Sequence, residues 1–194
     1  SASLDPNDYF KGLIIEPPGD NPISQSYGNY FSAFGAVETI TGTSSRDELT
    51  FGDYAAYDAG NITYNGEGGD DTLAFGAFAA QGAGSVITLN NSIGNQNYNF
   101  GGYAADNGGQ LSISTDNGNH SYSFSDGAGR DSGSISISSG DGDQSFSFGN
   151  SAAASGGNIS ISTGDGNHSY SFSWGAGRYS GSISISSGDG DQSF

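Results

Sequence analysis

Carboxylates in glycine-rich turns are the side chains of this sequence best suited to chemistry. Asp141 and Asp143, like Asp189 and Asp191, lie in the sequence Gly-Asp-Gly-Asp-Gln, and Asp165 occupies the matching place in Gly-Asp-Gly-Asn-His. Oxygen-rich, flexible turns of this kind suit Ca²⁺, which binds carboxylate and carbonyl oxygens. The other interpretation is a solvated acidic edge, because unit charges about 5 Å apart repel by less than about 1 kcal/mol in water.

Another acidic turn, Gly66–Phe75, contains Asp70 and Asp71 side by side. It resembles the Ca²⁺-binding nonapeptide G-G-x-G-x-D-x-U-x of RTX β-roll proteins. The first Gly, third Gly, Asp and large apolar positions of that motif match Gly66, Gly69, Asp71 and Leu73, and Glu67 replaces the second Gly. The resemblance implies a secreted β-roll relative with Ca²⁺ as its cofactor, bound first at Asp70 and Asp71.

At the place of Asp71 the later turns have His120, Gln144, His168 and Gln192. The two histidines recur only in every second unit, so stacked units would place them about 10 Å apart, too far to share a metal ion. We therefore interpret them as polar turn residues. The sequence shows no set of nucleophile, base and acid, and we expect that the protein is not an enzyme.

These turns recur because the chain repeats every 24 residues. Residues 109–146 return as 157–194 with six differences in 38 positions, and a weaker form of the pattern extends back to about residue 36. A fixed period in the range of about 20–50 residues is typical of stacked repeat proteins. We divide the repeat into seven units: 36–59, 60–84, 85–108, 109–132, 133–156, 157–180 and 181–194.

Two of the six differences replace acidic residues with aromatic ones. Trp174 stands where the earlier copy has Asp126, and Tyr179 stands where it has Asp131. These side chains are either surface aromatics that make contacts or the result of sequence drift.

The repeat predicts an all-β fold. In the unit 133–156, Ile135 and Ile137 alternate with serine, and Phe146 and Phe148 do the same after a polar turn. Such alternation is typical of strands with one buried face. Two strands per unit allow an antiparallel meander or a β-solenoid of about six to seven coils, and we favour the solenoid because near-identical units stack like residues on like. The expected inward columns are Ile113/Ile137/Ile161/Ile185, Phe124/Phe148/Phe172 and Ala104/Ala128/Ala152/Ala176.

The first 35 residues lie outside the pattern. They contain several aromatic and aliphatic residues together with Pro17, Pro18 and Pro22. We expect residues 1–35 to form an irregular N-terminal cap or assembly segment, and residues 36–194 to form the repeat domain.

Composition limits the possible partners. The net charge is −17, and the only strong cations are Lys11, Arg46, Arg130 and Arg178. Without a basic patch, we expect no binding to nucleic acid. The longest apolar run near the start is Leu13–Ile15, so membrane insertion is not expected either. Cysteine is absent, which excludes disulfides and thiolate metal sites and fits a secreted protein.

The predicted function is structural. Phe194 lies in the middle of a predicted strand, and an uncapped coil there would offer its edge to a second molecule. We expect a secreted, self-assembling subunit of an extracellular filament, matrix or cell-surface layer, with head-to-tail copies of itself as partners. The alternatives are a Ca²⁺-binding repeat module of an RTX-type adhesin and an ice-binding solenoid, whose flat hydroxyl array would consist of Ser112/Ser114, Ser136/Ser138, Ser160/Ser162 and Ser184/Ser186.

Overall fold

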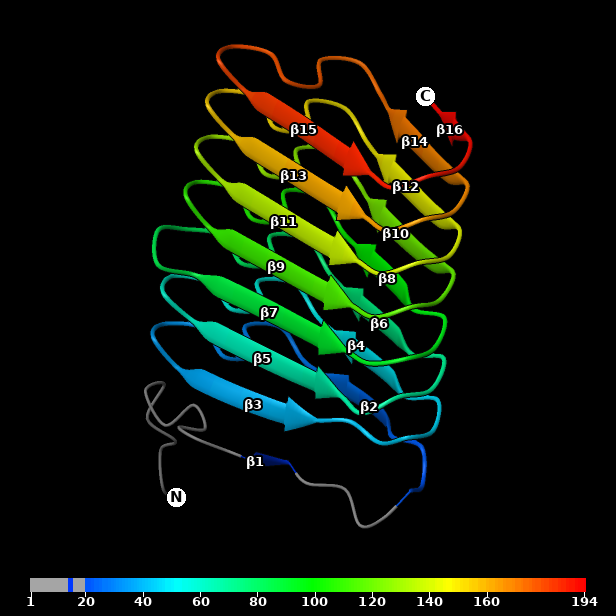
Figure 1. The fold of residues 1–194 in the computed structure, drawn as a ribbon. Helices are drawn as coiled ribbons and strands as arrows, with labels where there is room; N and C mark the ends of the chain where they lie inside the picture. Colours follow the sequence, from blue (N-terminus) through cyan, green and yellow to red (C-terminus); the bar gives the residue numbers. More distant parts are fainter. Residues whose placement is uncertain (1–13, 16–19) are drawn as a thin grey trace.

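The chain folds as a parallel β-solenoid of about seven coils (Figure 1). The computed structural model describes Ile14–Ile15 and residues 20–194. Each coil gives one strand to each of two eight-stranded sheets, and all strand pairs in these sheets are parallel. Parallel pairing excludes the antiparallel meander and confirms the predicted solenoid.

The two sheets divide the strands by odd and even number. The first contains β1 (Ile14–Ile15), β3 (Val37–Thr41), β5 (Asn61–Gly66), β7 (Val86–Asn91), β9 (Gln110–Thr115), β11 (Ser134–Ser139), β13 (Asn158–Thr163) and β15 (Ser182–Ser187). The second contains β2 (Ser24–Tyr27), β4 (Glu48–Phe51), β6 (Thr72–Phe75), β8 (Asn97–Phe100), β10 (His120–Phe124), β12 (Gln144–Phe148), β14 (His168–Phe172) and β16 (Gln192–Ser193).

The core lies between the sheets and consists of stacked like residues. Ile137 of β11 pairs in register with Ile113 and Ile161 of the neighbouring strands. The ring of Phe148 stacks between those of Phe124 and Phe172, with centroids 4.7 and 4.9 Å away. Each buried Ile or Phe contributes about 1.5–3 kcal/mol. The predicted isoleucine, phenylalanine and alanine columns are confirmed, and the alternating serines face solvent.

The described part of the first 35 residues contributes to both sheets. β1 pairs with β3, and β2 pairs with β4 in the same 24-residue register that the later coils use. Residues 1–13 and 16–19 lie outside the described residues, so the N-terminal cap remains a prediction. In the part that the structure describes, no helix is long and apolar enough to cross a membrane.

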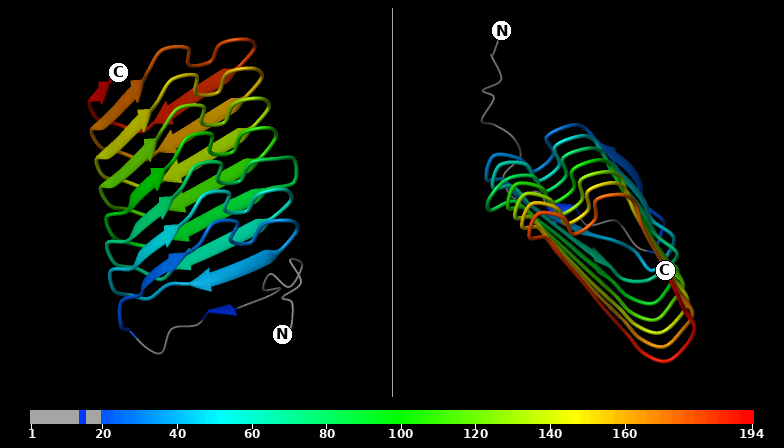
Figure 2. Two further views of the ribbon diagram at one scale, coloured as in Figure 1. Left: turned by 180° about the vertical axis from the view of Figure 1, so that it is seen from behind. Right: turned by 90° about the horizontal axis from the view of Figure 1, so that it is seen from above.

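Two kinds of turn form opposite edges of the flattened solenoid (Figure 2). A short turn joins each odd strand to the following even strand, and a long turn leads back to the next odd strand. In the long turn after β12, the residues Ser151, Ala153 and Ser155 have φ values of 59°, 50° and 55°. This left-handed conformation costs about 1–2 kcal/mol per non-glycine residue. Their amides donate hydrogen bonds of 2.8–2.9 Å to neighbouring coils, which offsets that cost.

Glycine at the start of the odd strands lets the coils approach each other. A Cβ atom on Gly133 would collide with the backbone carbonyl of Ala105, and one on Gly157 with that of Gly129. The clash is with backbone, which cannot move aside without breaking the inter-coil hydrogen bonds.

We expect Gly133→Ala to lower the free energy of unfolding by about 1–3 kcal/mol or more, since overpacking at a rigid site is relieved only by strain. The matched control is Gly102→Ala, because a Cβ there would meet only the Asp126 carbonyl oxygen, at 3.6 Å. The control should change stability by less than about 0.5 kcal/mol. Denaturant titration measures both; equal stability of the two variants would contradict this account.

Candidate functional site

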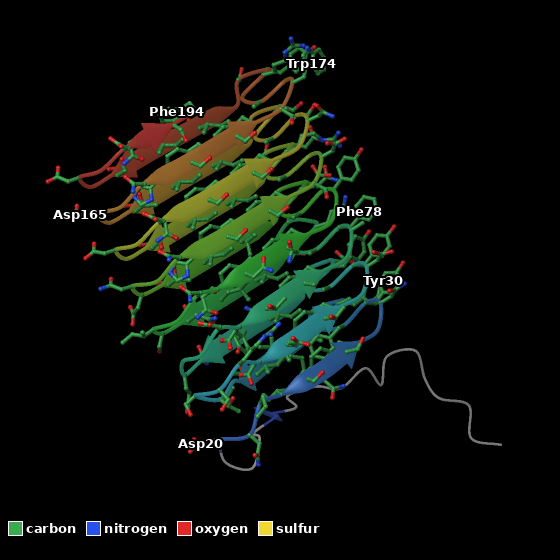
Figure 3. The ribbon with its side chains drawn as sticks, turned by 90° about the vertical axis from the view of Figure 1, so that its right-hand side faces the viewer. Asp20, Tyr30, Phe78, Asp165, Trp174 and Phe194 are labelled. Carbon is green, nitrogen blue, oxygen red and sulfur yellow. The ribbon has the colours of Figure 1, made fainter. Side chains whose placement is uncertain are left out.

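The acidic residues gather on the short-turn edge, where they form columns along the stack (Figure 3). In the first column the amide of Asp165 donates to Asp141 Oδ1 over 3.0 Å, and the amide of Asp189 donates to Asp165 Oδ1 over 2.7 Å. Each carboxylate therefore accepts the backbone N–H of its own counterpart in the next coil. A hydrogen bond from an amide to a charged acceptor is stronger than a neutral one.

A second outer column works in the same way with aspartate and asparagine in turn. The amide of Asn95 donates to Asp70 Oδ1 over 2.8 Å, and that of Asn167 donates to Asp143 Oδ1 over 2.8 Å. The amide of Asp191 donates to the Asn167 side-chain oxygen over 3.1 Å. Because an uncharged amide side chain replaces the carboxylate, what this position requires is an oxygen acceptor rather than a charge.

A third column lies inside the turn and accepts hydrogen bonds from the opposite direction. Its side chains bind the amide of their counterpart in the preceding coil: Asp71 Oδ1 accepts from Asp47, Gln96 Oε1 from Asp71, His120 Nδ1 from Gln96, Gln144 Oε1 from His120, and His168 Nδ1 from Gln144, over 2.9–3.3 Å. All of these side chains are buried. We name this set the inner acceptor column.

The two histidines of this column are not the polar turn residues predicted from sequence. His120 and His168 begin β10 and β14 and are buried. Their Nδ1 atoms accept from an amide, so the proton lies on Nε2, which donates to the carbonyls of Asp116 (2.9 Å) and Gly164 (3.0 Å). Burial lowers the pKa of His120. One coil separates the rings, and they do not meet at a common site.

Asp71 lies in the most enclosed part of the column. The Tyr64 hydroxyl is 3.2 Å from both Asp71 Oδ2 and Asp47 Oδ2, and Asn91 Nδ2 donates to Asp71 Oδ2 over 3.0 Å. Burial raises the pKa of Asp71 to about 7, against the hydrogen bond from the Asp47 amide, which lowers it; the nearby Asp47 charge adds to the rise.

The seven predicted Ca²⁺ ligands do not form one site. Asp71 belongs to the inner column and the other six to the two outer columns: Asp141, Asp165 and Asp189 in the first, and Asp70, Asp143 and Asp191 in the second.

Nor do their surroundings fit the ion, which needs six to eight oxygen ligands. The groups bound to Asp71 are N–H and O–H donors, and turn carbonyls such as Gly118 O accept from glutamine side chains. In the residues that the structure describes, no three His, Cys, Asp or Glu side chains lie close enough to hold a metal ion.

Comparison of the chain with protein-family models, curated proteins and solved structures gives no match. The parallel solenoid agrees with the fold that the RTX resemblance implied, and the resemblance itself rests on residues 66–75. The inner acceptor column was not predicted. Its signal in the sequence is an Asp, Gln or His in the same place before every even strand from β4 to β16.

We expect Asp71→Asn to preserve the fold, because the asparagine oxygen can still accept the Asp47 amide. Asp71→Ala removes the acceptor and should cost about 1–3 kcal/mol of stability, since the buried N–H loses its partner. Chemical denaturation at pH 8 compares the two. Equal losses in both variants would contradict the acceptor role.

The raised pKa of Asp71 also predicts a pH dependence. The folded chain holds this proton up to about pH 7, whereas an unfolded aspartate releases it near pH 4. The carboxyl therefore makes the free energy of unfolding fall as pH rises from about 4 to about 7. Subtracting the Asp71→Asn profile from that of the wild type should isolate this decline; a flat difference would show that Asp71 titrates normally.

Calcium should not stabilise the coils, because amides already occupy the carboxylates. Adding millimolar Ca²⁺ or EDTA should leave the melting temperature unchanged within error, and calorimetry should detect no saturable uptake. Saturable heat that Asp70→Asn and Asp71→Asn abolish would restore the metal site.

Proposed function

We propose that this protein is a structural repeat protein that assembles by stacking coils of separate copies end to end, as the subunit of an extracellular filament, matrix or surface layer. The supporting observation is the surface of the coil formed by β15 and β16, which matches the surface that each interior coil presents to its neighbour.

The strand β15 shows this match. Ile183 and Ile185 pair in register with Ile159 and Ile161 of β13, which are fully buried between neighbouring strands. The two isoleucines of β15 are only half-buried. The ring of Phe194 stacks on that of Tyr170 with centroids 5.1 Å apart and is 85% exposed. A further coil in the same register would bury these side chains, as it does everywhere else in the stack.

Backbone groups support the same arrangement. β15 and β16 are the edges of their sheets at one end of the described stack, and β1 and β2 are the edges at the other. An open edge offers unpaired N–H and C=O groups to another strand. Joining one end of a molecule to the opposite end of the next is a heterologous contact, which does not close and so produces a filament.

The extracellular location is supported by composition and by resemblance. The chain has no cysteine, has a net charge of −17 and contains the RTX-like turn at residues 66–75. The high net charge would also keep free copies soluble until their edges meet.

The ice-binding alternative rests on a different feature, the outward face of the odd-numbered sheet. Thr63, Thr88 and Ser112 pair in register, and Ser136 continues the column, so hydroxyl groups form a regular array. Thermal hysteresis measurements test this alternative independently of assembly.

We expect Ile185→Lys to abolish filaments while the earlier coils stay folded, because it places a charge in the contact between molecules. The matched control is Ser184→Lys, which adds the same charge on the outward face of the same strand and should leave assembly intact. Negative-stain microscopy and circular dichroism measure the two properties. A wild-type chain that stays monomeric at high concentration, or filaments that persist in Ile185→Lys, would refute the proposal.

A further inference from the structure

The long turns at residues 125–133 and 173–181 share a backbone but not a surface. Both have positive φ at the same four places, from 49° to 75° in the first and from 54° to 83° in the second. Asp126 and Asp131 of the first turn are replaced by Trp174 and Tyr179 in the second. Two carboxylates have thus become two aromatic rings on an unchanged scaffold.

The arginine within each turn has different partners as a result. Arg130 lies 2.9 Å from the Asp131 carboxylate and 3.6 Å from that of Asp106, and it stacks over the ring of Tyr103. At the places of those three partners Arg178 finds Tyr179, Ala154 and Ser151. Its guanidinium instead lies over the ring of Trp174, 3.9 Å from the centroid.

The second turn therefore presents an exposed cluster of Trp174, Arg178 and Tyr179, which we name the aromatic turn (Figure 3). The Trp174 and Tyr179 side chains are 68% and 76% exposed. Among the described residues, Arg46 and Arg130 each form an ion pair, and Arg178 is the one arginine with none. Trp, Tyr and Arg are the residues most enriched at the energetic centres of protein interfaces.

We propose that the aromatic turn binds the acidic short-turn edge of a second copy of this chain. Charge complementarity identifies the partner, because the exposed carboxylates of Asp141, Asp165 and Asp189 form a column on that edge. Adjacent members of the column are about 4.8 Å apart, the distance between paired strands. A guanidinium stacked on a ring keeps its in-plane N–H groups free to donate to carboxylates.

The two surfaces lie on opposite edges of the molecule, as the positions of Trp174 and Asp165 show (Figure 3). The contact therefore joins copies side by side, and it is heterologous, so it repeats without closing. It uses neither β15 nor β16 and is independent of end-to-end stacking. Where both contacts form, single filaments become ribbons.

The test is sedimentation velocity of the full chain as a function of concentration and salt. The double substitution Trp174→Asp and Tyr179→Asp gives this turn the side chains of the 126–131 turn, whose backbone is the same, so the variant should fold. We expect the wild type to associate at low ionic strength and the variant to do so at least about tenfold more weakly. High salt should reduce wild-type association, because exposed charges are screened.

Two further variants test the partners. Replacing Asp141, Asp165 and Asp189 with asparagine keeps the amide acceptors but removes the charge, and should weaken association to a similar degree. Phe34→Asp changes an exposed aromatic at the place of Tyr179 in an early long turn, and should have no effect. The proposal is overturned if the wild type is monomeric at low salt, or if either the aromatic-turn variant or the asparagine variant associates like the wild type.

Ile185→Lys separates this contact from the proposed filament. It should remove end-to-end assembly and leave the salt-sensitive lateral association in place. Loss of lateral association in Ile185→Lys would instead show that the aromatic turn acts only within filaments, which would overturn its independent role.

Discussion

The structure depends on the in-register stacking of each residue on its counterpart one coil away. Parallel strands set that separation at about 4.8 Å, and every side chain has to pack at this distance against a residue of its own kind. Flat aromatic rings meet the condition well: from Phe51 to Phe172 the phenylalanine centroids are 4.5–4.9 Å apart with nearly parallel planes. Glycines such as Gly133 meet it in another way, because they leave room for a backbone carbonyl.

The turns face a second demand, since amides outside the strands also need acceptors. The inner acceptor column satisfies amides of the preceding coil, and the outer columns satisfy amides of the following one. Asp, Asn, Gln and His exchange places in these columns because each offers an acceptor of suitable reach. The acidic motif that resembles a calcium loop is therefore explained by backbone hydrogen bonding, and the carboxylates remain available on their outer side for contacts between molecules.

Much of the fold could be predicted from sequence because apolar alternation and a 24-residue period act together. The positions of Ile137 and Phe148 follow from these two facts alone. The conformation of the long turns does not, because Ser151 and Ala153 adopt left-handed backbone only when neighbouring coils bind their amides. The burial of His120 was missed for a similar reason: a polar side chain is typical of a turn until the stacked amide that it accepts exists.

The regular partnership of equivalent residues has an evolutionary consequence. Residues 109–156 and the block that follows them carry the same alternation of His and Gln in the inner acceptor column, so a boundary between blocks joins the same surfaces wherever it falls. Recombination that deleted or duplicated 48 residues would recreate every inter-coil contact at the new junction. The length of the molecule could then change in steps of about 10 Å, two strand separations, without any new interaction having to evolve.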